Sequence, residues 1–355
     1  MTETKVDLLS MTPEELGVFF KAIGEPAFRA KQVFSAYHQK GLTLSEMTTL
    51  PRSLREKLSE TVEERMPTVE RKLVSAIDGT AKYLLRLTDG HLIECVLMLY
   101  EHGTTLCISS QVGCAMGCRF CASTIGGRVR NLYASELLGQ ILAVSRDSGE
   151  RIDGVVMMGI GEPLDNYGEV LKFLRLVNHP SGLCIGYRHI SLSTCGIVPR
   201  IYELAKEKLP ITLSISLHAS SDERRSAIMP VNRRWGIDEL LTACVDYFAE
   251  TGRRISFEYT LIAGENDSEQ EARALAKLLR SYFSSGEPIH VNLIRVNEVS
   301  ETGYHRPSRE AATHFCETLC RLGVNATVRR RLGADVNASC GQLRRAAESG
   351  EVPNG

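Results

Sequence analysis

The stretch Gln111-Val-Gly-Cys114-Ala-Met-Gly-Cys118-Arg-Phe-Cys121 brings three cysteines together in the spacing C-x3-C-x2-C, with Phe120 directly before the last. A structural zinc ion usually takes four ligands from two separated cysteine pairs, and most cubane clusters also take four thiolates. Three thiolates can hold three irons of a [4Fe-4S] cluster and leave the fourth open to a substrate or cofactor. The spacing therefore favours such a cluster, with zinc and a distant fourth ligand as the alternative.

A regular alternation of strands and helices begins just before this stretch. Runs typical of buried strands occur at 105–109, 154–158, 189–193, 212–216, 255–261 and 290–295. Amphipathic helical stretches follow at about 133–147, 167–178, 198–207, 237–250, 268–283 and 307–322. Six such units predict parallel strands with right-handed crossovers. The expected fold class is α/β, a partial (βα)6 TIM-like barrel, with a doubly wound sheet as the alternative; in both, the reactive groups lie at the carboxyl ends of the strands.

The overall composition excludes several classes of protein. The 355 residues carry 42 Lys and Arg against 43 Asp and Glu, and this net charge of −1 excludes a uniformly basic nucleic-acid coat protein. The 11 cysteines are an odd number, so a fully paired disulfide framework within one chain is excluded. The first residues do not resemble a secretory signal, and no apolar run reaches the roughly 18 residues of a membrane helix. We expect a cytoplasmic protein with reduced thiols.

Sequence character divides the chain into four regions. They are a helical accessory domain of RNA-binding type (1–66), a β extension (67–100), the barrel (101–300), and a C-terminal helix, strand and loop (301–355). Thr12 and Pro13 predict a helix start, with Thr12 as the cap. Residues 28–40 form a helix whose basic side chains either face nucleic acid or are simply solvated. These side chains are Arg29, Lys31 and Lys40.

Six further cysteines are interpreted as small packing residues without a chemical role. They are Cys95, Cys184, Cys195, Cys244, Cys316 and Cys320. Cys340 differs, because it lies in the polar stretch Ala334-Asp-Val-Asn-Ala-Ser-Cys-Gly-Gln-Leu after the last helix, where a thiol can be accessible and reactive.

The cysteine motif with its aromatic residue resembles the signature of the radical S-adenosylmethionine (SAM) enzymes, which have a six-unit partial barrel. The longer string from Leu106 to Thr124, together with Arg130-Asn-Leu, is similar to the RlmN-type branch of that family. The similarity extends from Gly24-Glu-Pro-Ala-Phe-Arg-Ala to Cys340-Gly-Gln-Leu, nearly the whole chain. It implies a [4Fe-4S] cluster held by Cys114, Cys118 and Cys121, with an open iron for SAM.

The resemblance also implies a SAM site at the strand ends. Gly159-Ile-Gly-Glu-Pro-Leu is not a dinucleotide loop, because Leu164 stands where the third glycine belongs. In the family, the matching Gly-Glu-Pro segment meets the amino group of the methionine moiety, a reasonable partner for a carboxylate. The SAM-binding residues implied in this way are Gly161, Glu162, Ser193, Ser216, Leu217, His218 and Asn297.

Three more residues are implied to be catalytic. Cys340 matches the family's methylated cysteine, Cys107 its second essential cysteine, and Glu94 its proton acceptor; the local pattern alone makes Glu94 an outward-facing strand residue. One SAM methylates Cys340, and a second yields a 5′-deoxyadenosyl radical that activates this methyl group for addition to adenine. Glu94 removes the ring proton, and Cys107 releases the product by forming a disulfide with Cys340. A radical is needed because carbon 2 of adenine is not nucleophilic.

The implied substrates are adenosines in 23S rRNA and tRNA, methylated at carbon 2. Residues 329–345 carry a local charge of +4, from Arg329, Arg330, Arg331, Arg344 and Arg345 against Asp335. Phosphate contacts there would bring RNA to Cys340, with a solvated basic turn as the alternative. The resemblance further implies a monomer, no membrane contact, and a one-electron donor such as flavodoxin or ferredoxin.

Two rival functions stay open at this stage. The first is methylation of carbon 8 of the same ribosomal adenosine by a Cfr-type enzyme; Pro163 and its neighbours look more like the carbon-2 branch. The second is a non-enzymatic, zinc-stabilised RNA-binding or ribosome-assembly protein.

Overall fold

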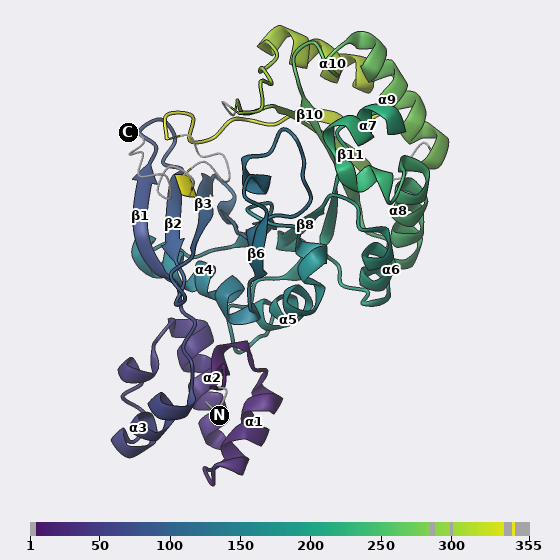
Figure 1. Cartoon of the computed structure of the whole chain (residues 1–355). Helices are drawn as coiled ribbons and strands as arrows, with labels where there is room; N and C mark the ends of the chain where they lie inside the picture. Colours follow the sequence, from purple (N-terminus) through teal and green to yellow (C-terminus); the bar gives the residue numbers. More distant parts are fainter. Residues whose placement is uncertain (1–4, 285–287, 299–300, 337–342, 345–355) are drawn as a thin grey trace.

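A mixed ten-stranded sheet forms the centre of the molecule (Figure 1). The computed structural model describes residues 5–284, 288–298, 301–336 and 343–344. The sheet order is β1-β2-β3-β4-β7-β8-β9-β10-β11-β12. Its strands are β1 (Thr68–Val74), β2 (Ala81–Arg86), β3 (Leu92–Tyr100), β4 (Gly103–Cys107), β7 (Gly154–Met157), β8 (Ile190–Thr194), β9 (Thr212–Ser216), β10 (Ile255–Leu261), β11 (Ile289–Arg295) and β12 (Ala326–Val328).

The sheet changes from antiparallel to parallel at β4. Strands β1 to β4 form an antiparallel meander, whereas β4 and β7 to β12 run parallel to one another. The six predicted core strands correspond to β4, β7, β8, β9, β10 and β11, so this prediction is confirmed. The seventh parallel strand, β12, is the strand expected without bounds in the C-terminal region; it has only three residues. The two edge strands, β1 and β12, do not pair with each other, so the barrel is open.

Helices between the parallel strands cover the outer face of the sheet (Figure 1). They are α4 (Ala134–Ser148), α5 (Tyr167–Val177), α6 (Val198–Lys206), α7 (Asp222–Ile228), α8 (Ile237–Thr251), α9 (Glu269–Tyr282) and α10 (Arg309–Arg321). All but the short α7 were predicted. Apolar side chains of these helices and of the strands form one continuous core, as expected for a layered α/β domain. Among the described residues, no helix has the length and apolar character needed to cross a membrane.

The N-terminal helices form a separate group that packs near α4 and α5 (Figure 1). They are α1 (Pro13–Ala22), α2 (Phe28–Lys40) and α3 (Arg52–Thr61). Thr12 caps α1 in a capping box with Glu15, as predicted. Asp7 fastens the group to α4, because its Oδ2 accepts hydrogen bonds from Ser135 Oγ at 2.6 Å and from Ser10 Oγ at 2.7 Å.

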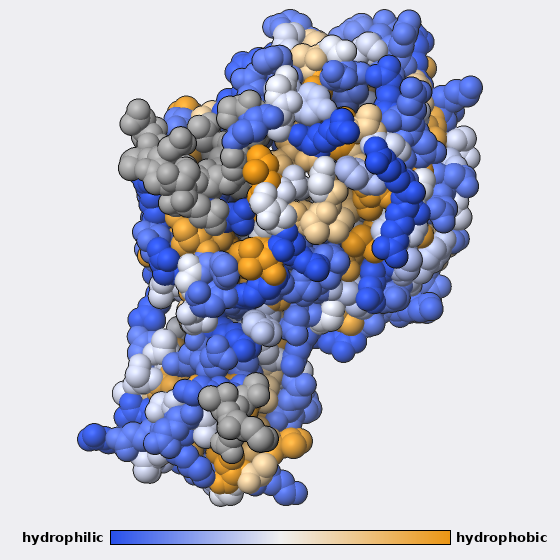
Figure 2. Space-filling model, in the orientation of Figure 1, coloured by the Kyte–Doolittle hydropathy of each residue, from blue (hydrophilic) through white to orange (hydrophobic). Residues whose placement is uncertain are grey.

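The strand ends and their loops lie on a face that carries both hydrophilic and apolar side chains. Figure 2 shows hydrophilic residues over most of this face, with apolar side chains gathered near its centre, in the region where β6 (Arg128–Asn131) and β8 lie in Figure 1. Apolar side chains around a hollow with few polar groups are typical of small-molecule sites.

Candidate functional site

A two-stranded hairpin frames the cysteine loop. Strand β5 (Gln111–Gly113) pairs antiparallel with β6. The backbone N–H of Cys114 donates to Gly127 O at 3.1 Å, which closes the loop at its base. Gly113 has φ +75°, and a Cβ built on it would lie 2.0 Å from Gly127 O. Only glycine allows this close approach, so the cysteine loop requires it.

The three cysteines of the motif line one cavity. Cys114 is buried, and Cys118 and Cys121 are half-buried around the same hollow. Within the described residues, no three His, Cys, Asp or Glu side chains converge on a single metal position. A cluster needs a different arrangement, because each iron takes its own thiolate. Burial raises the pKa of the Cys114 thiol to about 12, so a positively charged group is needed to make it a thiolate ligand. This donor set fits a cluster with three cysteine ligands.

The segment that carries Glu162 lies directly against the residues before the cysteine loop. Gly161 has φ +108°, and a Cβ there would lie 2.7 Å from Ser110 Oγ. Glu162 is 3% exposed; its Oε2 accepts from the backbone N–H of Cys195 at 2.7 Å, and its Oε1 from that of Leu164 at 3.0 Å. Burial raises the pKa of this carboxyl. An ammonium group in the adjoining cavity would offset that cost.

The ends of β8 and β9 complete the cavity. Ser193 and Ser216 are half-buried, and their hydroxyl oxygens lie 3.5 Å apart. Together with Gly161, Glu162 and His218 they line the cavity that the three cysteines enter. The structure therefore brings these five predicted residues to one place, because parallel strands end at the same edge of the sheet.

His218 is held in one chemical form. Its Nδ1 accepts a hydrogen bond from the backbone N–H of Thr260 at 2.9 Å, so the ring proton is on Nε2. Burial, and then the charge of Arg225, lower its pKa to about 3. Its φ of +59° is unusual for a residue with a Cβ. His218 therefore contributes a neutral imidazole, edge-on to Phe120 with ring centroids 4.9 Å apart.

Two of the predicted SAM contacts lie elsewhere. The Leu217 side chain is fully buried in the main core, so at most its backbone faces the cavity. Asn297 lines a neighbouring cavity with Cys107, and its Oδ1 accepts a hydrogen bond from Arg306 at 3.2 Å. The two cavities share Met158, Ile294 and Arg329.

Cys107 and Glu94 occupy one face of the antiparallel part of the sheet. Val96 pairs directly with Cys107 across β3 and β4, and Glu94 lies two residues before Val96, hence on the same face. Glu94 is 2% exposed and forms an ion pair with Lys82, Nζ to Oε2 at 3.2 Å. The expectation that Glu94 faces outward is therefore wrong: the C-terminal segment covers it, and the Arg344 backbone N–H donates to its Oε1 at 2.5 Å.

The C-terminal segment lies across this face on both sides of Cys340. Leu332 packs on the cluster of Val96, Met98 and Cys107, and Leu343 packs on Leu84 and Leu92. Cys340 and Arg345 lie outside the described residues. Arg344 is 5% exposed, so the predicted role of its side chain in an exposed basic patch is wrong.

Known proteins resemble this chain over nearly its full length. The radical SAM superfamily profile matches residues 108–276, and the profile of the ribosomal RNA large subunit methyltransferase N-terminal domain matches residues 6–63. A probable dual-specificity RNA methyltransferase RlmN from Clostridium botulinum (strain Eklund 17B) is 53% identical over 339 residues, 96% of each chain. One of the same name from Alkaliphilus oremlandii is 52% identical over 341 residues, 96% of this chain and 98% of its own.

The chain belongs to the RlmN family of radical SAM methyltransferases. The crystal structure of a radical SAM methyltransferase from Sphaerobacter thermophilus superimposes on this RlmN-family chain with a TM-score of 0.89 at 42% identity, covering 95% of this chain and 98% of that one. Radical SAM proteins use a [4Fe-4S] cluster and SAM as cofactors. The single cavity lined by the three cysteines and the strand-end residues matches that pair of cofactors in donor type.

One residue at the RlmN-family site was missed from the sequence. Arg225, on the unpredicted α7, is fully buried behind the cavity. Its guanidinium donates to the backbone oxygens of Cys195, Ser216 and Leu217, at 2.6, 3.1 and 3.1 Å. It therefore holds the ends of β8 and β9 in register. The only sequence signal is the helix start Ser221-Asp-Glu, which predicts α7 but not the burial of its arginine.

The interpretation of the six other cysteines of this chain is correct in part. Cys95, Cys195 and Cys244 are buried, and Cys316 is half-buried against the main core. Cys184 and Cys320 are exposed, so they are not core residues. Cys184 has φ +55°, in the left-handed region that turns adopt.

Proposed function

We propose that this RlmN-family chain methylates carbon 2 of adenosine in 23S rRNA and in tRNA. The names of the relatives support an RNA substrate with dual specificity. The observation that carries the proposal is the shared sheet face of Cys107 and Glu94, on which Leu332 and Leu343 pack. These anchors lie before and after Cys340 in the chain, which supports a reaction between the thiols of Cys340 and Cys107.

Cys114, Cys118 and Cys121 are the proposed cluster ligands. Glu162 is the proposed partner of the SAM ammonium group, because its buried carboxylate borders the cysteine cavity. Ser193, Ser216, the Leu217 backbone and the Nε2–H of His218 would contact the remainder of SAM, with Gly161 allowing close approach. Asn297, in the neighbouring cavity, is proposed to reach SAM from the side of Cys107.

The first chemical step is proposed to occur at Cys340. Its thiolate displaces the methyl group from the sulfonium of one SAM, so a new sulfur–carbon bond forms as the old one breaks. S-adenosylhomocysteine leaves. Cys107 lies nearby in the chain's fold, in a largely apolar cluster on which Leu332 packs.

The second step transfers the methyl carbon to RNA. When bound, the cluster and a second SAM supply a 5′-deoxyadenosyl radical, which removes one hydrogen atom from methylated Cys340. The resulting carbon radical would add to carbon 2 of adenine; the adduct would pass one electron to the oxidised form of the flavodoxin- or ferredoxin-type donor, and Glu94 would accept the ring proton. The Cys107 thiolate then attacks the Cys340 sulfur, so a disulfide forms while the carbon–sulfur bond to RNA breaks and the released carbon takes a proton. A thiol reductant restores both cysteines.

The chain is proposed to act in the cytoplasm as a monomer, with flavodoxin or ferredoxin as the electron donor. Its proposed regions are the helical accessory domain, the β extension, the barrel and the C-terminal segment, as defined from the sequence. Zinc would require a fourth ligand. Among the described residues, no three His, Cys, Asp or Glu side chains, the three cysteines included, converge on a single metal position.

Peptide mass spectrometry of Cys340 tests the mechanism. Protein purified from cells should carry one added methyl group on Cys340, and the Cys107→Ala variant should remain covalently attached to RNA because the releasing disulfide cannot form. An unmethylated Cys340 in protein that still methylates RNA would contradict the mechanism.

Nucleoside analysis tests the position of methylation. RNA from a deletion strain should lose 2-methyladenosine in both 23S rRNA and tRNA, and the intact gene should restore it. Loss of 8-methyladenosine instead would identify the Cfr-type reaction.

A further inference from the structure

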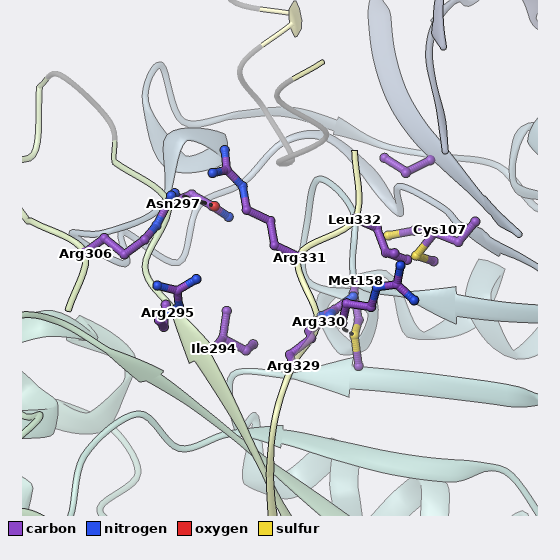
Figure 3. Close-up of a pocket in the computed structure, with 12 residues that line it drawn as sticks. Cys107, Met158, Ile294, Arg295, Asn297, Arg306, Arg329, Arg330, Arg331 and Leu332 are labelled. Carbon is purple, nitrogen blue, oxygen red and sulfur yellow. Dashed lines mark hydrogen bonds between the residues drawn. The ribbon is translucent and has the colours of Figure 1, made fainter. Parts of the chain in front are cut away.

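A group of arginines surrounds the mouth of the Cys107 cavity. Its members come from the end of β11, the following loop, the start of α10 and the residues after β12. They are Arg295, Arg306, Arg309, Arg329, Arg330 and Arg331. Five of them line the Cys107 cavity, and all six line a second cavity beside it. Figure 3 shows Arg295, Arg306 and Arg331 on the side of Asn297, across from Cys107 and Leu332.

This arginine group is poorly neutralised. In the part of the chain that the structure describes, none of the six forms an ion pair with Asp or Glu. The neighbouring acids are Glu258, Glu298, Glu310 and Asp78. Burial, followed by the charge of neighbouring arginines, lowers the pKa of Arg295 and of Arg331. Positive charges held together in this way favour a polyanionic ligand.

Two of the arginines are already fixed by the protein. Arg306 donates to Val296 O at 3.0 Å and to Asn297, and the Arg329 backbone N–H donates to Leu293 O at 2.8 Å. Arg309 and Arg331 are exposed and reach the second cavity from two different segments. The Arg331 guanidinium donates to Ala334 O at 3.4 Å through one nitrogen, so it keeps further donors, as Arg309 does, for a ligand in the cavity beside the Cys107 cavity.

We propose that this arginine group binds the RNA backbone at a phosphodiester next to the target adenosine. The inference rests on the proposed function and replaces the basic patch expected from residues 329–345, because Arg344 is buried while Arg295, Arg306 and Arg309 join from elsewhere. Guanidinium groups bind phosphate oxygens in pairs, so arginines from two segments can hold successive phosphates. A phosphate fixed in the second cavity would direct the neighbouring base to the Cys107 cavity.

Fluorescence polarisation with the full-length protein tests the inference. The probe is a labelled RNA hairpin with adenosine in its loop, and the dissociation constant is measured over a series of KCl concentrations. The variant Arg309→Gln/Arg331→Gln should bind roughly tenfold more weakly at moderate salt. The slope of log Kd against log [KCl] should decrease by roughly 0.7 for each phosphate that the variant no longer neutralises.

Helices α9 and α10 offer a matched control. Arg321, at the far end of α10, and Arg280, which donates to Leu322 O, are exposed and lie outside both cavities. Arg280→Gln/Arg321→Gln should bind as the wild type does, and Arg309→Lys/Arg331→Lys should retain most of the salt slope. Arg309→Gln alone gives the same test if the double variant does not fold.

The outcomes are distinguishable. Wild-type binding that is unchanged in Arg309→Gln/Arg331→Gln, or reduced equally in the control variant, would overturn the phosphodiester site alone. No RNA binding by the wild-type protein would also contradict the proposed function.

Discussion

At the scale of single residues, the Lys82–Glu94 pair is the most consequential feature of the sheet face. Both side chains are almost fully buried, 1% and 2% exposed. Removing one partner of a buried ion pair leaves an uncompensated charge, which typically costs about 3–5 kcal/mol. Lys82→Met should therefore lower the free energy of unfolding by that order, as measured by urea denaturation.

The double variant Lys82→Met/Glu94→Gln separates charge from packing. It leaves no isolated charge, so it should recover most of the stability that Lys82→Met removes. It should still fail to release RNA product, since Glu94 is the proposed proton acceptor. Equal instability of the single and double variants would contradict this electrostatic explanation.

His38 of α2 provides a test of pH dependence. It is fully buried, its ring stacks on Phe34 with centroids 4.1 Å apart, and burial lowers its pKa from 6.5 to about 3. Between these values the unfolded chain binds a proton that the folded chain does not, so His38 makes the protein less stable as pH falls from 6.5 towards 3. As pH falls through this window, the free energy of unfolding should decrease by up to about 1.4 kcal/mol less per pH unit in His38→Phe than in the wild type.

The measurement is urea unfolding of wild type and His38→Phe at a series of pH values. The exposed His102 gives the control, because in His102→Phe the replaced side chain meets water in both states. Parallel stability curves for wild type and His38→Phe would show that His38 does not titrate on unfolding.

The motif residues meet at one cavity, as the strand order predicts, but the burial of individual residues was not predicted well. The local sequence of β3 predicts that Glu94 faces solvent, yet Lys82 on β2 and the Arg344 backbone enclose it. Cys320 lies on an amphipathic helix but on its exposed side. Both errors have one cause: burial depends on which distant segment covers a residue.

At the scale of elements, the β5–β6 hairpin determines the position of the cysteine loop. Gly113→Ala would place a Cβ 2.0 Å from Gly127 O, so the loop must move while the main sheet stays intact. The expected result is a large loss of bound iron after anaerobic reconstitution, with unchanged far-ultraviolet circular dichroism. Iron and sulfide analysis measures this directly.

Gly126→Ala is the matched control for the hairpin. Gly126 also has a positive φ, +87°, but a Cβ there meets nothing within 4 Å. An alanine at position 126 therefore costs only the backbone strain of a positive φ, about 1 kcal/mol, and the variant should retain its iron content. Equal iron loss in both variants would mean that strain, not the contact with Gly127, determines the loop.

Long elements were predicted and short ones were missed. The six core strands and their helices have enough residues for a clear periodicity. The three-residue strand β5 and the seven-residue α7 do not, although α7 carries Arg225. The three-residue β12, which leads into three members of the arginine group, was expected only as a C-terminal strand without bounds. These elements exist because neighbouring strands and loops hold them.

At the scale of the whole molecule, a polar contact at Asp7 joins the N-terminal helices to the barrel, in addition to apolar contacts within the common core. Asp7 accepts hydrogen bonds from Ser135 and Ser10, and Arg65 Nη1 lies 3.4 Å from its Oδ2. Asp7→Ala should lower stability by roughly 1–3 kcal/mol and expose the connection near residues 63–67 to protease. Limited proteolysis followed by mass analysis measures this.

An ion pair at the same interface gives the comparison. Lys172 and Glu15 lie 3.4 Å apart at the surface, so Lys172→Ala should cost less than about 1 kcal/mol and leave the cleavage rate unchanged. Faster cleavage in Lys172→Ala than in Asp7→Ala would show that surface charge, rather than the Asp7 contact, holds the helices in place.

The cysteine loop, the six strand–helix units and the strand-end residues could be predicted from the sequence, because spacing and periodicity are properties of neighbouring residues. The contact between Lys82 and Glu94, the burial of Arg344, and the gathering of arginines from four segments beside Cys107 emerge only in the folded chain. The physical reason is distance along the chain. Contacts between remote residues depend on how the sheet and its covering segments pack, and no local pattern records that packing.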